Sequence, residues 1–184
     1  LGLAWDRPAL AALGFAGGTL HILNHALFKC LLFYGAGAVY RATHTVDLER
    51  LGGLAKVMPR TTLLVLVGAL AMCAVPPLNG FVSELCIFAG LLSGAAPTAE
   101  ARALLVLCAA LLAFVGGLSA VAMARAFGVA FLGLPRDPAA TATGEVAPSL
   151  HVAMLACALG AVALGAWPQA GLALVHGPTR LALA

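Results

Sequence analysis

Residues 75–80 read Val-Pro-Pro-Leu-Asn-Gly and lie inside an apolar run that extends from residue 61 to residue 92. Two adjacent prolines remove two backbone donors and clash with the preceding turn, while glycine admits backbone angles that other residues avoid. We therefore predict two half-helices that meet at Pro76-Pro77. Such breaks tend to line transport sites within a membrane, because protein or water must satisfy the freed backbone groups. A proline kink of purely structural use is the alternative.

The composition around this break is that of a membrane protein. Of the 184 residues, 62% are hydrophobic and only 9% are charged, whereas soluble domains carry roughly a quarter charged residues. One helical crossing takes about 20 residues. We predict an all-α, polytopic transmembrane helix bundle that forms a single membrane domain over residues 1–184. The expected crossings are approximately residues 8–40, 61–92, 102–132 and 149–166.

The distribution of basic residues predicts the orientation. Four Lys and Arg side chains lie in residues 41–60, whereas the connection near residues 93–102 carries only Arg102. Because basic loops stay on the cytoplasmic side, the connection over residues 41–60 and the one after residue 132 are predicted to be cytoplasmic, with both chain ends opposite. The net charge of +3 is mild and spread over the loops, which excludes nucleic acid as a partner.

Three titratable residues of the first crossing recur at helical spacing. His21, His25 and Lys29 stand at positions i, i+4 and i+8, so they share one helix face over roughly 12 Å. An imidazole can accept on one nitrogen and donate from the other, so this row can pass protons in short hops. The alternatives are satisfied core histidines and a Lys29 that snorkels to an interface.

Glu84 follows the break by a few residues and is the acidic residue deep in the second run. The free N–H groups at the start of the second half-helix favour the carboxylate, whereas burial favours the neutral acid. We predict that Glu84, Lys29, His25 and His21 form a proton relay. Approach and withdrawal of Lys29, or of a neighbouring subunit, would switch the charge of Glu84.

No cofactor or metal is predicted. His21 and His25 cannot clamp one haem, because side chains at i and i+4 point the same way while axial ligands approach iron from opposite faces. His44 and His151 are interpreted as surface-loop residues. The five cysteines stand singly within apolar segments, without a C-x-x-C pair, which is typical of small hydrophobic core residues.

Several motifs together resemble a known family. Residues 20–29 read Leu-His-Ile-Leu-Asn-His-Ala-Leu-Phe-Lys, residues 51–54 read Leu-Gly-Gly-Leu, and residues 76–84 read Pro-Pro-Leu-Asn-Gly-Phe-Val-Ser-Glu. In this order they resemble the antiporter-like membrane subunits of respiratory complex I. The last motif is especially similar to the large membrane subunit of hydrogenase-4 and formate hydrogenlyase. The chain looks like a C-terminal fragment of such a subunit.

The resemblance implies two inverted repeats, each with a broken helix and half of a proton path, of which this chain is the second. It places His21, His25 and Lys29 on the helix before the break and gives Glu84 the role of handing protons to the outlet. It implies neighbouring membrane subunits, a hydrophilic redox arm, and a multi-pass location in the cell inner (plasma) membrane. The transported ion would be H⁺, or else Na⁺, and the chain itself would perform no redox chemistry.

Two other functions fit the same motifs. A multisubunit cation/proton antiporter shares them but lacks a redox arm. A structural subunit without transport is the third possibility, and it predicts that Lys29 and Glu84 are dispensable for coupled activity.

Overall fold

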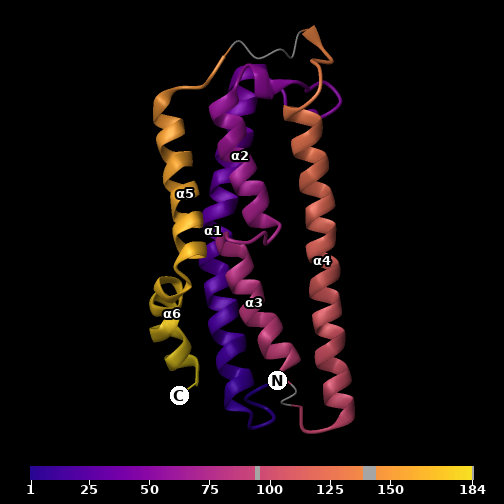
Figure 1. Ribbon diagram of the computed structural model, residues 1–184, viewed down its shortest axis with the longest axis vertical. Coiled ribbons are helices and arrows are strands. Elements are labelled where there is room, and N and C mark those ends of the chain that lie inside the picture. Colours follow the sequence, from indigo (N-terminus) through magenta and orange to yellow (C-terminus); the bar gives the residue numbers. More distant parts are fainter. Residues whose placement is uncertain (94–95, 139–143, 184) are drawn as a thin grey trace.

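The computed structural model describes residues 1–93, 96–138 and 144–183. Within these residues the chain folds into α-helices and one short 3-10 helix, η1, at Leu54–Lys56 (Figure 1). The α-helices are α1 (Pro8–Thr43), α2 (Pro59–Met72), α3 (Asn79–Leu92), α4 (Ala99–Phe131), α5 (Pro148–Ala166) and α6 (Pro168–Leu183).

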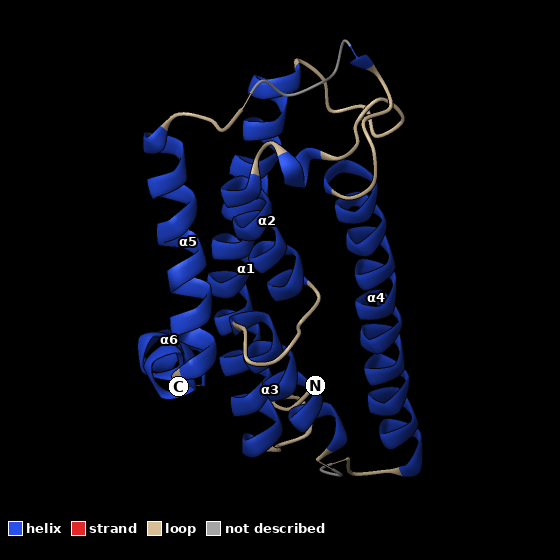
Figure 2. Cartoon of the chain, turned by 45° about the horizontal axis from the view of Figure 1, so that its top comes forward, coloured by secondary structure: helices blue, strands red, loops and turns tan. Residues whose placement is uncertain are grey.

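The bundle is built along α1. This helix has 36 residues and is therefore about 54 Å long, which exceeds a hydrocarbon core of ~30 Å. The half-helices α2 and α3 follow one another along α1, and a non-helical connection joins them at mid-height (Figures 1 and 2). The predicted break at Pro76-Pro77 is confirmed, since α2 ends at Met72 and α3 begins at Asn79.

Close backbone contacts surround the break. A Cβ on Gly80 would clash with the backbone carbonyl of Ala71, so the start of α3 packs directly on the end of α2. A Cβ on Gly165 would clash with the carbonyl of Pro77, so α5 crosses the same connection. Ala74 adopts a positive φ of 52°, a conformation that is uncommon for residues other than glycine. Glycine at these two crossings therefore lets three helices meet at one point.

The expected membrane crossings agree with the helices. Among the described residues α1, α4 and α5 are each long and apolar enough to span a membrane, whereas α2 and α3 are shorter apolar helices. The pair α2 and α3, which follow one another along α1, corresponds to the remaining predicted crossing with its break. The observed bounds differ from the predicted ones by up to three residues, apart from the helix-free connection over 73–78.

Residues after 167 were not predicted to be helical, and the structure corrects this. They form α6, which packs against the lower part of the bundle through Val175, buried together with Leu20 and Val82. Both termini lie at the same end of the molecule (Figure 1), as the predicted even number of crossings requires.

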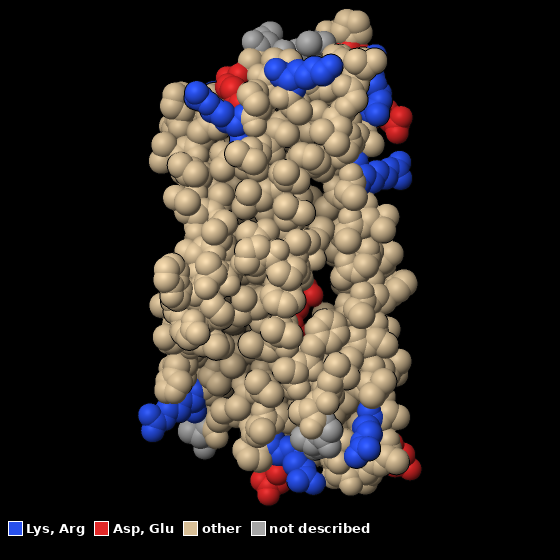
Figure 3. All heavy atoms as spheres, in the orientation of Figure 1, with Lys and Arg blue, Asp and Glu red and all other residues tan. Residues whose placement is uncertain are grey.

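Charged side chains mark the two ends of the bundle. Figure 3 shows that Lys, Arg, Asp and Glu gather at the top and bottom of the visible face, while its middle is almost uncharged apart from acidic atoms in a hollow. At the end that holds residues 44–58, Arg50 Nε binds Asp137 Oδ2 at 2.7 Å, and Arg136 Nη1 donates to the carbonyls of Leu48 and Leu51. These contacts fasten the segment after α4 to the connection between α1 and α2.

Candidate proton-transfer site at the helix break

The two histidines of α1 lie side by side. The ring centroids of His21 and His25 are 6.1 Å apart, and the ring of Phe28 packs edge-on against His25 at 5.3 Å. His21 is partly buried and His25 is exposed on this chain. The i, i+4 spacing therefore brings the two imidazoles to one face of α1.

His21 reaches across to α3. Its Nδ1 lies 3.1 Å from the hydroxyl oxygen of Ser83, which is fully buried. The Ser83 hydroxyl donates to the carbonyl of Gly80 at 3.0 Å. Because a serine has only one O–H, its oxygen must accept from His21 Nδ1–H in this arrangement. Neutral His21 then keeps Nε2 as a free acceptor. Sequence reasoning missed Ser83, although it directly precedes Glu84.

Two asparagines join α1 to the first residue of α3. Asn24 Nδ2 donates to the backbone carbonyl of Asn79 at 2.7 Å, and Asn79 Nδ2 donates to the carbonyl of Asn24 at 3.3 Å. The exposed fractions of the two residues are 1% and 0%. The break is thus tied to α1 within one helical turn of His21, and the sequence motifs gave no signal of this pairing.

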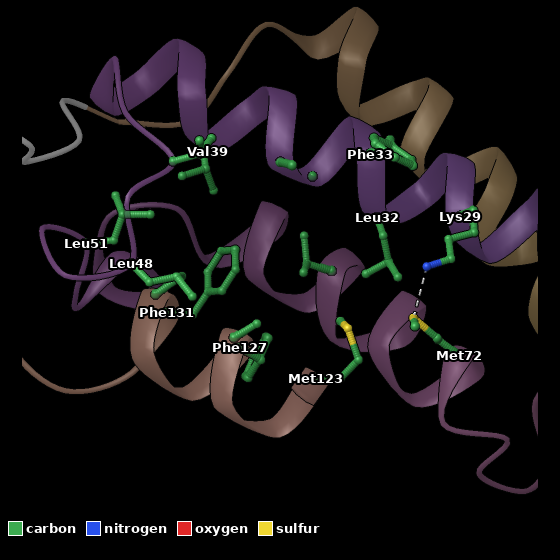
Figure 4. Close-up of a pocket in the computed structure, with 16 residues that line it drawn as sticks. Lys29, Leu32, Phe33, Val39, Leu48, Leu51, Met72, Met123, Phe127 and Phe131 are labelled. Atoms are coloured by element: carbon green, nitrogen blue, oxygen red, sulfur yellow. Dashed lines mark hydrogen bonds between the residues drawn. The ribbon is translucent and has the colours of Figure 1, made fainter. Parts of the chain in front are cut away.

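Lys29 points into a cavity of about 300 Å³ that is otherwise apolar (Figure 4). Its walls come from α1, from α2, from the end of α4 and from residues 46–51. The ammonium nitrogen donates to the Met72 sulfur at 3.6 Å. Within the described residues no carboxylate lies within 4 Å of Lys29. The structure therefore places Lys29 at the end of α2 rather than in an ion pair with Glu84.

Glu84 on α3 also lies near the end of α2. It is partly buried on α3 and close enough to the Cys73 thiol to interact with it electrostatically. Cys73 Sγ in turn lies 3.9 Å from the carbonyl of Ser119 on α4. Met72 and Cys73 are neighbours at the end of α2. Lys29 on α1 and Glu84 on α3 therefore interact with adjacent residues at that point.

Comparison with known proteins assigns the fold to a family. A family model described as NADH:quinone oxidoreductase/Mrp antiporter, transmembrane, matches residues 8–113, which is more than half of the chain. The chain belongs to this family. The matched segment contains His21, His25, Lys29, the break and Glu84, so all four predicted relay residues lie within the NADH:quinone oxidoreductase/Mrp antiporter region.

Individual members of the family give the same picture. The chain is 46% identical over 171 residues to formate hydrogenlyase subunit 3 of Escherichia coli, covering 88% of this chain and 28% of that protein. It is 43% identical over 156 residues to hydrogenase-4 component B of the same organism, covering 84% of this chain and 23% of that protein. The chain thus spans about a quarter of the length of these relatives.

A solved structure supports the fold independently. A chain of the Mrp complex from Dietzia sp. superposes with a TM-score of 0.70 at 24% identity, covering 88% of this chain and 36% of that chain. The resemblance stated from the motifs is therefore confirmed, as is the all-helical membrane fold. The Mrp likeness concerns the fold alone.

A second polar cluster joins Arg60 and Thr61, inside the region that the antiporter family model matches, to Glu145 and His151, which lie beyond it. Glu145 Oε2 accepts from the Thr61 hydroxyl at 2.7 Å and lies 3.0 Å from His151 Nε2, while Oε1 accepts from the backbone N–H of Arg60 at 2.6 Å. The His151 side chain is only 16% exposed and stands in the first turn of α5. The interpretation of His151 as a surface-loop residue is therefore wrong, because its side chain is partly buried in contact with Glu145 and Thr61. His44, by contrast, is exposed at the C-cap of α1.

The electrostatics of Glu145 follow from these contacts. Partial burial by itself raises the pKa of the Glu145 carboxyl, but hydrogen bonds from Thr61, from the backbone of Arg60 and Thr61 and from His151 outweigh it, and the pKa is lowered. The carboxylate caps the N-terminus of α2, where the helix dipole also favours an anion. In the part of the chain that the structure describes, no three His, Cys, Asp or Glu side chains are grouped to hold a metal ion.

Proposed function

We propose that this chain is the proton-translocating part of a membrane subunit in a hydrogenase- or quinone-reductase-type complex. The observation that supports this most directly is the convergence of Lys29 and Glu84 on Met72 and Cys73, where α2 is interrupted. Ionisable groups inside a membrane are costly and usually functional. A broken helix beside them is the arrangement that membrane transporters use for ion sites.

The residues suggest the direction of proton hops. His25 receives a proton at the exposed side and passes it to Nε2 of His21, whose Nδ1–H is held by Ser83. The doubly protonated His21 then releases one proton and returns to its neutral form. The carboxylate of Glu84, the residue that follows Ser83, accepts this proton through bridging water. An ammonium near that carboxylate favours its charged form and so promotes release, whereas withdrawal of the ammonium favours uptake. Lys29 supplies this charge through movement of its flexible side chain past Met72.

Partners and location extend the proposal. The relatives are named as a subunit, a component and part of a complex, so the chain is a membrane subunit of a multisubunit type. We propose that a hydrophilic redox arm drives it, that it resides in the cell inner (plasma) membrane, and that H⁺ rather than Na⁺ is moved. We also propose that residues 1–184 act as one membrane domain.

Proton flux in sealed vesicles tests the proposal. The complex that contains the full-length protein is reconstituted, and lumen acidification is followed while its electron donor is oxidised. Glu84→Gln and Lys29→Ala are expected to abolish most acidification while assembly is retained. Glu100→Gln and Lys56→Ala are the matched controls, because both residues are exposed at helix ends. Unchanged acidification in Glu84→Gln, with intact assembly, would refute the proposal.

A multisubunit cation/proton antiporter is the second candidate, favoured by the Mrp antiporters within the matched family. It predicts acidification driven by a Na⁺ pulse in the absence of any electron donor, and genes for small antiporter subunits beside this one. A purely structural subunit predicts that both Glu84→Gln and Lys29→Ala move protons normally, while deletion of the chain prevents assembly.

A further inference from the structure

Asn24 and Asn79 form a reciprocal pair of hydrogen bonds. The NH₂ group of each side chain donates to the backbone carbonyl of the other residue, at 2.7 Å and 3.3 Å. The orientation of both amides is thereby fixed, because a flipped amide would place its oxygen against a carbonyl oxygen. The two bonds join α1 to the first residue of α3 from both directions.

The pair carries a cost in stability. The Oδ1 atoms of Asn24 and Asn79 are both buried and have no hydrogen-bond partner among the described residues. A buried acceptor without a partner loses its hydration and gains nothing in exchange. Two apolar side chains of similar volume would avoid this penalty and fill the same space. Stability alone therefore does not account for the two asparagines.

The pair does fix the position of α3 along α1. Asn24 lies one turn after His21 on α1, and Asn79 lies one turn before Ser83 on α3. The hydrogen bond between His21 Nδ1 and Ser83, 3.1 Å long, depends on this register, since a slip by one residue displaces a helix by about 1.5 Å. Glu84 moves with Ser83.

We propose that Asn24 and Asn79 are positioning residues that hold α3 in the register at which Ser83 meets His21 and Glu84 faces the end of α2. The inference rests on the proposed function in one respect, namely that His21 and Glu84 carry protons. Neither asparagine transfers a proton itself. Their contribution is the backbone register, maintained at the expense of two unpaired oxygens.

The double variant Asn24→Leu/Asn79→Leu in the full-length protein, within its assembled complex, tests this role. The expected unfolding temperature is equal to that of the wild type or higher, because the two unpaired oxygens are gone. The protons moved per electron pair are expected to fall at least about tenfold, as displacement of reacting groups by roughly 1 Å has effects of this size or larger. A merely structural role would instead lower the amount of complex and leave this ratio unchanged.

Val82→Ala is the matched control, since Val82 is buried on the same helix against Leu20 and Val175. It is expected to show the opposite pattern, a lower unfolding temperature with an unchanged proton ratio. If the double variant fails to assemble, Asn24→Ala removes only the shorter bond and is expected to lower the ratio partially.

A wild-type proton ratio in the double variant, or in Asn24→Ala where the double variant does not assemble, would overturn the inference. Glu84→Gln is measured in parallel to separate the two hypotheses. If Glu84→Gln loses proton movement while the asparagine variants keep it, only the positioning role is refuted. If Glu84→Gln moves protons normally, the proposed function itself is refuted.

Discussion

The ammonium of Lys29 and the sulfur of Met72 lie 3.6 Å apart at the end of α2, in a cavity whose other walls are apolar. A thioether is a weak acceptor, so this contact leaves the charge poorly compensated. Lys29 is therefore held where it can exchange partners, rather than locked in an ion pair.

Lys29→Met is expected to separate stability from function. Removal of a poorly paired charge from an apolar cavity should leave the free energy of unfolding unchanged or raise it by up to about 2 kcal/mol, while proton movement falls. Chemical denaturation and vesicle acidification measure the two effects. Lys56→Met, at an exposed position of η1, should change neither, and a clear loss of stability in Lys29→Met would contradict this account.

Ser83→Ala is expected to lower the free energy of unfolding by about 1–2 kcal/mol, because His21 Nδ1–H loses its acceptor. It should also slow proton movement, since the histidine tautomer is no longer fixed. Ser93→Ala is a close control, because Ser93 donates to the carbonyl of Gly90 as Ser83 does to that of Gly80. Equal proton movement in the Ser83 and Ser93 variants would show that the His21 contact is dispensable.

Gly165→Ala is expected to destabilise the protein by about 1–3 kcal/mol, since the added methyl group meets the carbonyl of Pro77. Gly116→Ala should be neutral or stabilising, because nothing of the protein lies near the added methyl group and alanine favours helix. Thermal unfolding of the two variants checks the prediction, which fails if their unfolding temperatures change alike.

The hydrogen bonds of the Glu145 carboxylate at the start of α2 should make the free energy of unfolding depend on pH. Since its pKa is lowered in the folded state, the carboxylate stabilises the fold above the ordinary pKa of 4.5, and this contribution is lost as the pH falls through the lowered folded-state value. Glu145→Gln should remove that part of the acid sensitivity. Unfolding temperatures at pH 7 and at a pH below 4.5 measure it. Glu49→Gln, at an exposed position, should retain the wild-type dependence.

Features with local causes were predictable from the sequence. Adjacent prolines dictate the break whatever surrounds them, and helical periodicity places His21 and His25 on one face of α1. The sequence also indicated that Glu84 follows the break closely. The expected pairing of Lys29 with Glu84 was less predictable. Lys29 instead lies beside Met72, a position that depends on how α1 and α2 pack.

Features with long-range causes were not predictable. The contact of His21 with Ser83 spans 62 positions and that of Thr61 with His151 spans 90, so both follow from helix packing rather than from any local pattern. The helix α6 was missed because Gly171, Gly177 and Pro178 weaken its propensity, and the burial of Val175 in the bundle compensates for this.

The bare crossing of Gly165 over Pro77 also has a mechanical meaning. No side chain separates Gly165 from Pro77, so the backbone of α5 packs directly against the connection between α2 and α3. We therefore expect a tilt of the half-helix that carries Glu84 to displace α5 and, through Trp167, the adjoining α6. A change of charge at Glu84 would then be accompanied by movement of α6.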